Sequence, residues 1–444
     1  MMMKSLDKKL AAIHADPSGC KEFIIADAKD ADMAFGIGTA GVRADGSLKT
    51  MVDYQEQIRQ IVRQGKVDIM LMSASNNDQL NNRERLFDDS HITPASRAND
   101  TTDVWVARGN RYIQEPSLPF RSATLDHIQA GKIDPTPEQR RRGTDLGLYS
   151  ITFNNRLAED RLALERYAAF RDEAERKGFR HFFEVFDPNA PFELPAEKIP
   201  DFVNDCIVRT LAGVPTAARP IFLKVVYHGP KAMEDLVAYD PTLVVGILGG
   251  GAGTTYDAFK LISEAQKYGA RVALYGRKIN NAENQLAFVE FLRLITDRVI
   301  SPEEAVKAYH GVLAKLGIKP QRKLEDDLVL QTAVMSYGGG STVSVPVGIP
   351  RDDAKPAAAA TPAAHSHDSH SHDAHHDCKC AKKDPTPKPA GADCGCRKAA
   401  AQAQANDGTA AKKEEAAPKS VAEMTPAEKL AYNQAKRDRI FGKF

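Results

Sequence analysis

The chain has 444 residues, enough for two or three average domains. Its 60 basic residues nearly balance its 59 acidic ones, so the net charge of +1 gives no reason to expect binding to nucleic acid or to an anionic membrane. No apolar run approaches the roughly 18 residues of a membrane span, and residues 1–21, interpreted as an N-terminal extension, lack the apolar stretch of a secretory signal. With the lone Cys20 and Cys206, these features predict a cytoplasmic protein.

Composition divides the rest of the chain into three parts. Residues 22–330 have ordinary globular composition and are predicted to form one folded domain. Residues 338–423 are dominated by Ala, Pro, Lys, His and Asp, and such a segment buries too little apolar surface to offset the entropy of ordering it. We therefore expect a disordered linker there, followed by a short helix at 424–444.

The folded part repeats a strand, turn and helix rhythm that is typical of parallel sheets with helical crossovers. Several of the strands are near-continuous apolar runs, which suits strands that are covered on both faces. The predicted helices are residues 54–64, 159–177, 199–211, 256–268 and 284–296. The predicted strands are residues 22–26, 67–72, 103–107, 147–153, 181–186, 220–227, 243–248 and 271–275.

Eight strands are the number of a (β/α)₈ barrel, although a doubly wound open sheet would give a similar rhythm. The residues at the strand ends, described next, favour the barrel. The polar, Pro-rich segment 76–145 is an unusually long insertion between strands. Long insertions in such folds tend to be functional, so we expect it to form a lid or rim.

Lys224 is the most informative residue, because it lies within the apolar run 221–227. A lysine inside a buried strand is costly unless it is paired or its pKa is depressed. An uncharged lysine is a nucleophile that forms a Schiff base with a carbonyl. The alternative is an outward-facing lysine whose stem covers apolar surface while the amine reaches water.

Glu184 lies among apolar and aromatic residues on the preceding predicted strand. Adjacent strands would place its carboxylate near Lys224, where it could transfer protons during carbinolamine formation and carbon–carbon cleavage. The alternative is a structural ion pair between Lys224 and Glu184.

The ends of the last two strands have the composition of a phosphate site. Gly249, Gly250 and Gly251 follow the seventh strand, and Gly276 with Arg277 follows the eighth. Glycine turns let backbone N–H groups approach an anion, arginine binds phosphate bidentately, and this fold often binds phosphate there. The alternative is a pair of flexible turns.

Asp27 and Lys29 are expected to end the first strand, where they could orient substrate hydroxyls or hold a second phosphate. The alternative is a pair of solvated loop charges.

The segments 183–187 (FEVFD) and 222–226 (FLKVV) resemble the fifth and sixth strands of the tagatose-bisphosphate and sulfofructose-phosphate aldolase family. They are also similar to archaeal-type class I fructose-bisphosphate aldolases and to deoxyribose-phosphate aldolases. The resemblance implies a class I aldolase in which Glu184 is the fifth-strand glutamate and Lys224 the Schiff-base lysine. It also implies a phosphate turn at Gly276–Arg277, a catalytic role for Asp27, and cleavage to a dihydroxyacetone-phosphate type of product. Lys29 stands where the family has arginine.

The resemblance covers residues 22–320 and is strongest over 148–294. It weakens over 73–144, where the family has a shorter, different connection from the second to the fourth strand. Because this loop helps to shape the mouth of the site, the resemblance does not identify the substrate.

The linker is rich in metal-binding side chains. Imidazoles and thiolates bind Zn, Cu or Ni, so we expect adventitious metal binding, but this spacing does not define a folded zinc module. No cofactor is expected for catalysis. The predicted ligands are His365, His367, His370, His372, His375, His376, Cys378, Cys380, Cys394 and Cys396.

Residues 425–428 (TPAE) form a capping box with Pro at the first helical position, which predicts a short basic helix over 427–441. A short helix on a long tether is a docking device. It resembles the C-terminal peptides that carry enzymes into bacterial microcompartments, so a shell protein is an expected partner.

The sequence thus predicts a class I aldolase acting on a phosphorylated sugar, and we also expect a homo-oligomer. Two alternatives remain. One is a tethered phosphate-binding, metal-binding or scaffold component without catalysis. The other is a barrel isomerase or epimerase that uses the acid and the phosphate site without a Schiff base.

Overall fold

The computed structural model describes residues 3–332, apart from 44, 108–109, 190–193 and 251–252. The predicted linker and C-terminal helix, with all ten predicted metal ligands, lie outside the described residues. No helix in the described part of the chain combines the length and the apolar character needed to cross a membrane.

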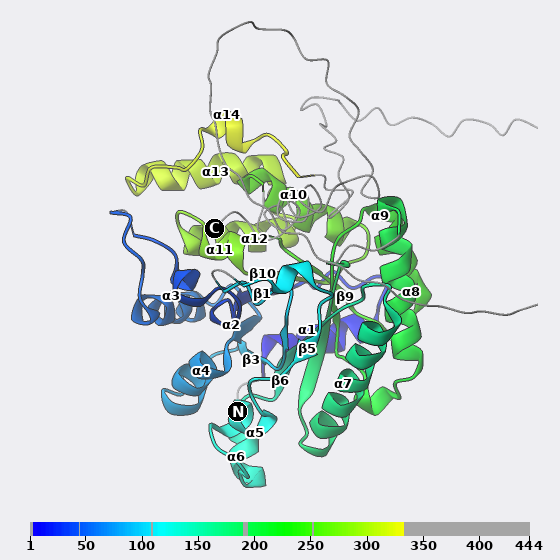
Figure 1. Ribbon diagram of the computed structural model, residues 1–444. Coiled ribbons are helices and arrows are strands. Elements are labelled where there is room, and N and C mark those ends of the chain that lie inside the picture. Colours follow the sequence, from blue (N-terminus) through cyan, green and yellow to red (C-terminus); the bar gives the residue numbers. More distant parts are fainter. Residues whose placement is uncertain (1–2, 44, 108–109, 190–193, 251–252, 333–444) are drawn as a thin grey trace, which may run out of the picture. The chain divides into compact units, whose positions relative to one another are not determined.

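The eight-stranded barrel is confirmed (Figure 1). Its strands are parallel, and the first pairs with the last to close the sheet. In order around the barrel they are β1 (Ile24–Lys29), β2 (Ile69–Met72), β3 (Thr93–Arg97), β6 (Leu146–Thr152), β7 (Arg180–Phe186), β8 (Leu223–Val225), β9 (Val245–Leu248) and β10 (Val272–Tyr275).

The prediction for the third strand was wrong. Residues 103–107 form no barrel strand, and Trp105 is 40% exposed. The third barrel strand is β3, whose sequence TPASR lacks a large apolar side chain although all five residues are buried. A strand with small and polar side chains gives no hydrophobic signal, whereas the β-favouring Trp and Val of 103–107 gave a false one.

The five predicted helices are confirmed, and their ends follow ordinary capping chemistry. In α3, for example, Thr50 and Asp53 form a capping box, and the left-handed Gly65 follows the last turn. These helices are α3 (Met51–Gln64), α7 (Leu157–Arg176), α8 (Ile199–Ala212), α10 (Thr255–Lys267) and α12 (Gln285–Thr296). The other helices include α2 (Asp32–Phe35), α4 (Ala74–Asn77), α9 (Pro230–Tyr239), α11 (Arg277–Asn280), α13 (Pro302–Lys315) and α14 (Leu324–Asp327).

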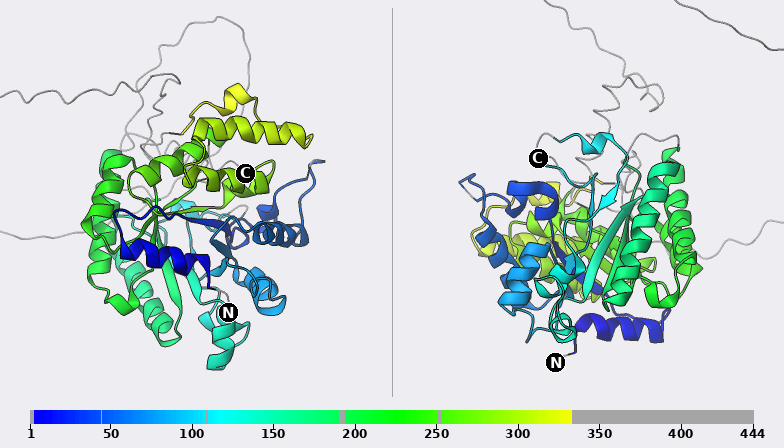
Figure 2. Two further views of the ribbon diagram at one scale, coloured as in Figure 1. Left: turned by 180° about the vertical axis from the view of Figure 1, so that it is seen from behind. Right: turned by 60° about the horizontal axis from the view of Figure 1, so that its bottom comes forward.

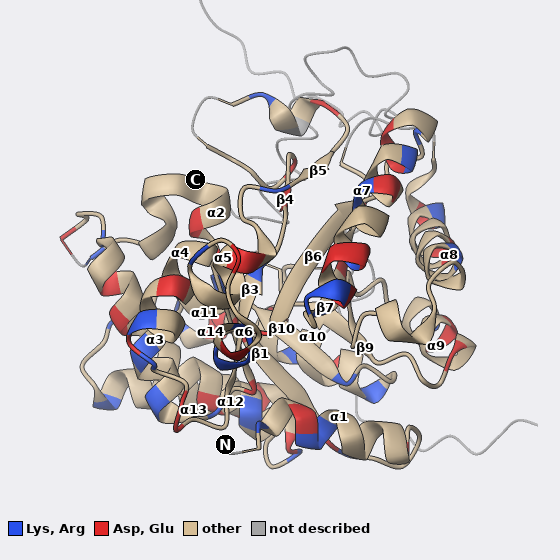
Figure 3. Ribbon diagram, turned by 90° about the horizontal axis from the view of Figure 1, so that it is seen from below, with Lys and Arg blue, Asp and Glu red and all other residues tan. Residues whose placement is uncertain are grey.

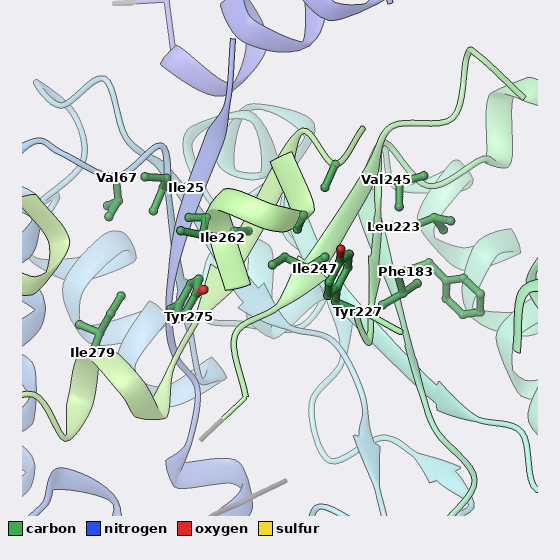
Figure 4. Close-up of a cluster of buried hydrophobic side chains, with 14 of the residues drawn as sticks. Ile25, Val67, Phe183, Leu223, Tyr227, Val245, Ile247, Ile262, Tyr275 and Ile279 are labelled. Atoms are coloured by element: carbon green, nitrogen blue, oxygen red, sulfur yellow. The ribbon is translucent and has the colours of Figure 1, made fainter. Parts of the chain in front are cut away.

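The apolar side chains on the two faces of the barrel strands belong to two different clusters. Ile24, Phe182 and Phe222 belong to the cluster inside the barrel. Their neighbours Ile25, Phe183 and Leu223 belong to the layer between the barrel and its helices (Figure 4). Because side chains alternate along a strand, even-numbered positions of β1, β7 and β8 point into the lumen, and odd-numbered positions point toward the helices.

The N-terminal extension contains a helix, α1 (Ser5–Ala15), that lies across one end of the barrel (Figure 2). Its apolar side chains Leu6, Leu10 and Ile13 are at most 8% exposed and pack onto the lumen cluster. The helix therefore covers the N-terminal end of the barrel, opposite the C-terminal strand ends.

The long insertion lies mainly between β3 and β6 and contributes elements to both ends of the barrel. A two-stranded sheet of β4 (Asp100–Thr101) and β5 (Pro119–Phe120) follows the C-terminal end of β3. Asp103 ties this segment to the end of β6 by accepting a 2.8 Å hydrogen bond from Thr152. The helices α5 (Leu125–Ala130) and α6 (Pro137–Arg142) then lead to the start of β6, at the opposite end.

Candidate active site at the C-terminal strand ends

Lys224 and Glu184 form an ion pair in the barrel lumen. They are register partners on the neighbouring strands β8 and β7. The Lys224 Nζ lies 2.5 Å from the Glu184 Oε1, and their side chains are 10% and 2% exposed. The structure therefore brings together the predicted nucleophile and the predicted proton-transfer group.

A chain of polar side chains continues from this pair across the lumen. Ser150 on β6 donates a 2.6 Å hydrogen bond to the Glu184 Oε2. Arg97 on β3 donates to the Ser150 Oγ at 3.3 Å and to the Asp30 Oδ2 at 2.9 Å. Both Glu184 oxygens are thus held, which fixes the orientation of the carboxylate.

Arg97 supplies a permanent positive charge to this chain. Burial disfavours its charged form, but Asp30 and Glu184 outweigh that effect and hold the pKa of Arg97 above its ordinary value. Asn99 fixes the strand beside it by accepting from the Ser150 backbone N–H at 2.7 Å and donating to the Ser150 carbonyl oxygen at 2.7 Å.

A second pair with acid–base character follows the same two strands. His228 comes four residues after Lys224, and its Nε2 lies 2.8 Å from the Asp187 Oδ1. Both side chains are at most 7% exposed. A histidine oriented by a carboxylate is a common proton-transfer arrangement.

Asp27 and Lys29 lie elsewhere. Strand β1 is longer than predicted, so both residues lie within it, at odd-numbered positions that face the helices. Lys29 is fully buried and donates to Asn280 at 3.2 Å and Gln285 at 2.9 Å. The structure does not bring Asp27 or Lys29 together with Lys224. Asp30, which directly follows β1 and accepts from Arg97, is the acid on the lumen side.

Burial controls the titration of this outer pair. It raises the pKa of Asp27 to about 6, although Lys29, 3.7 Å away, opposes the shift. It also lowers the pKa of Lys29, against the attraction of Asp27.

The structure places the two predicted phosphate turns at adjacent strand ends. Gly249 and Gly276 follow β9 and β10, and Arg277 begins α11. A Cβ at Gly249 would lie 2.3 Å from the Tyr275 ring, and one at Gly276 would lie 2.9 Å from the Ala28 carbonyl oxygen. These two glycines therefore have a packing role, whatever they bind.

Further details of the turns bear on anion binding. Gly250 has a φ of +59°, in the left-handed region, and Gly251 lies outside the described residues. Lys278 links the turns by donating to the carbonyl oxygens of Gly253 at 2.7 Å and Thr254 at 3.0 Å. Burial lowers the pKa of Lys278 to about 8.

The N-terminus of α10, which follows the seventh-strand turn, is already occupied by carboxylates of the chain. The Asp257 Oδ2 accepts from the Thr254 N–H at 2.7 Å, and the Asp327 Oδ1 accepts from the Thr255 N–H at 2.8 Å. An anion at these turns would therefore depend on the glycine backbone and Arg277 rather than on these amides.

Sequence reasoning missed several residues that the structure places at this end. Asp30 was missed because the first strand extends to Lys29 rather than ending at residue 26, and Arg97 because the third strand lies elsewhere in the sequence. Ser150 lies within a correctly predicted strand, but it was not selected as a site residue. Strict alternation along the first strand would have selected Asp30 with Ala28 and separated both from Lys29. No group of three or more metal-ligating side chains occurs within the described ranges.

The sequence matches none of the protein-family models and none of the curated proteins with which it was compared. Among solved structures, an archaeal fructose 1,6-bisphosphate aldolase has a TM-score of 0.47 at 15% identity, over 66% of this chain and 99% of that one. A Corynebacterium glutamicum protein has a TM-score of 0.46 at 15% identity, over 67% and 99%. Triosephosphate isomerase of Bartonella henselae has a TM-score of 0.35 at 15% identity, over 63% and 100%. At these values the likeness is one of barrel architecture, which the strand order establishes independently.

Proposed function

We propose that this chain is a class I aldolase, in which Lys224 forms a Schiff base with the carbonyl group of a phosphorylated sugar. The observation that carries the proposal is the 2.5 Å pair of Lys224 and Glu184 in the lumen. This pair lies toward the C-terminal ends of the strands, where barrels of this kind carry their active sites.

The reaction requires an uncharged amine, and Glu184 is positioned to accept the ammonium proton. Lys224 then attacks the carbonyl carbon, and the carbinolamine loses water to give the iminium ion. The same carboxylate returns a proton to the departing hydroxyl group. Ser150 donates to Glu184 and keeps it oriented through both transfers.

Cleavage of the carbon–carbon bond requires a base for the substrate hydroxyl proton. The His228 imidazole, held by Asp187, is our candidate for this base, because it belongs to the same strand end as Lys224. The iminium ion accepts the electron pair of the broken bond and becomes an enamine, whose carbon takes a proton back from the His228 imidazolium. Hydrolysis of the iminium ion formed in this way releases the second product and regenerates Lys224. The mechanism uses no cofactor.

Gly249, Gly250, Gly276 and Arg277 would hold the substrate phosphate. Arg277 supports this role because it belongs to the turn that follows β10, at the C-terminal end of the barrel, and carries a guanidinium group able to bind phosphate.

Reduction with borohydride in the presence of dihydroxyacetone phosphate tests the proposal. The full chain should gain the mass of one reduced adduct, and Lys224→Met should gain none. Lys231→Met is the matched control, because this lysine side chain is 85% exposed; it should be trapped like the wild type. Folded protein that forms no adduct with this or other phosphorylated ketoses would contradict the proposal. Turnover that survives in Lys224→Met would favour the isomerase or epimerase instead.

A further inference from the structure

A cleft lies at the opposite, N-terminal end of the barrel, with a volume of about 740 Å³. It is lined by Thr93 and Pro94 at the start of β3, by Asp145 before β6 and by Arg180 at the start of β7. The lining includes eight basic and three acidic residues, a balance of +5 in a chain whose total is +1. Figure 3 views the molecule from the side on which α5 and α6 lie, with basic residues in blue.

Most of these basic side chains already have partners. Arg180 pairs with Asp7 at 2.6 Å and with Asp145 at 2.8 Å. Arg140 and Lys177 share Asp126, each at 2.6 Å. The first set of ion pairs joins α1 to the start of β7, and the second joins α5, α6 and the end of α7. The wall of the cleft is therefore held in place by contacts within the chain.

The α6 segment is held by its backbone as well. Arg85 donates a 2.8 Å hydrogen bond to the Arg142 carbonyl oxygen. Arg85 has a φ of +61°, a conformation that is uncommon for a residue other than glycine. Next to Arg142, a Cβ at Gly143 would lie 1.4 Å from the Gln129 carbonyl oxygen, so only glycine permits this approach of the chain. The end of α6 is thus placed firmly beside the cleft.

Three basic side chains of the lining remain for a ligand. Arg141 and Arg142 are exposed and form no ion pair with another described residue. Arg176 has a loose contact, 3.7 Å from Asp172, with both side chains more than two-thirds exposed. Such a surface pair contributes little to stability and is easily exchanged for a ligand.

We propose that this cleft is a second binding site, which takes a small organic anion carrying two or more phosphate groups and holds it through Arg141, Arg142 and Arg176. Guanidinium groups bind phosphate oxygens in bidentate pairs, and three of them in the lining of one cleft match a polyphosphate better than a single carboxylate. The volume lies within the roughly 300–1,000 Å³ typical of small-molecule sites. Phe87, Pro94 and Pro137 supply apolar lining for the organic part.

The site is separate from the proposed aldolase chemistry, because the cleft is lined by the starts of β3 and β7, whereas Lys224 is the register partner of Glu184, further along β7. Titration calorimetry of the full chain with inorganic pyrophosphate and with ATP tests it, at low salt and with a chelator present to keep metals off the predicted tail ligands. We expect both probes to bind the wild type. Arg141→Ala/Arg142→Ala should weaken both at least about tenfold, since each charged hydrogen bond is worth roughly 1.5–3 kcal/mol.

Three controls make the result specific. Arg161→Ala/Arg209→Ala removes the same charge from exposed positions of α7 and α8 and should bind like the wild type. Arg141→Lys/Arg142→Lys keeps the charge and should recover part of the affinity. Arg277→Ala should leave the cleft binding event intact, because that residue belongs to the other end of the barrel. The proposal is overturned if the wild type binds neither probe, or if Arg141→Ala/Arg142→Ala binds them as the wild type does while remaining folded.

Discussion

Two buried lysine–carboxylate pairs lie on opposite faces of the same barrel wall. Lys29 and Asp27 face the helices, are fully buried and lie 3.7 Å apart. Lys224 and Glu184 face the lumen, lie 2.5 Å apart and leave 10% of the lysine side chain exposed. Lys29 donates hydrogen bonds to the side-chain amides of Asn280 and Gln285. The partner of Lys224 at 2.5 Å is instead the Glu184 carboxylate, which is able to take a proton.

The comparison teaches that burial of a lysine does not by itself indicate chemistry. Burial lowers the pKa of Lys29, but Lys29 is enclosed by the chain and has no access for a substrate. Lys224 has a proton acceptor in Glu184, which Ser150 holds in a fixed orientation, and 10% of its own side chain is exposed. We therefore expect variants of the two pairs to behave differently: the lumen pair should control turnover, and the outer pair should control stability.

The largest expected effect is that of Lys224→Met on turnover. Loss of a covalent nucleophile should reduce kcat by at least about 10⁴-fold, because the remaining groups cannot form the iminium ion. Steady-state kinetics on a phosphorylated ketose would measure this loss. An activity within tenfold of the wild type would remove the distinction between the two lysines.

Glu184→Gln should have the next largest effect. The amide keeps the shape and a hydrogen-bond acceptor for Ser150 but cannot take the ammonium proton, so kcat should fall about 10²–10⁴-fold. The pH profile is the discriminating readout, because rising pH should partly restore the variant as solvent removes the proton from Lys224. A purely structural glutamate would show no such recovery.

Lys29→Met should instead affect stability. Removing one member of a buried pair leaves Asp27 without its counter-charge, at a cost of about 3–5 kcal/mol in the free energy of unfolding at pH 8. Turnover per folded molecule should stay within about threefold of the wild type. Urea denaturation and kinetics on the same sample would measure both quantities, and a selective loss of turnover would show that Lys29 acts in the site.

The smallest expected effect is a pH dependence from Asp27. Its pKa of about 6 in the folded chain lies above its ordinary value of 3.8. Between these values the folded chain holds a proton that the unfolded chain has lost, so this contribution to stability is present below pH 3.8 and is lost as the pH rises through 6. The free energy of unfolding of Asp27→Asn, measured relative to that of the wild type, should therefore rise by about 2–3 kcal/mol between pH 4 and pH 7. A constant difference across this range would contradict the shift.

The sequence was most informative where strands are apolar runs. The strands that carry Glu184 and Lys224 were found this way, and parallel pairing of neighbours then put the two side chains in contact. It failed at β3, where Arg97 lies in a buried strand without large apolar residues. It also failed to orient β1, because Asp27 and Asp30 are both acids near one strand end and only the register of alternation separates them.

The cleft at the other end of the barrel could not be predicted from sequence. Its basic residues come from the N-cap of α1, the segment between β2 and β3, α6, the end of α7 and the start of β7, far apart along the chain. The run Arg140–Arg141–Arg142 by itself is typical of a solvated helix end that favours the helix dipole. The concave shape appears once the long insertion folds back against the N-terminal end of the barrel.

Peptide mapping of the borohydride-reduced protein tests the central claim most directly, because it compares the two lysines in one sample. After reduction with the phosphorylated ketose and digestion, we predict the adduct on the peptide that contains Lys224 and an unmodified peptide that contains Lys29. An adduct on Lys29, or on exposed lysines in place of Lys224, would contradict the account.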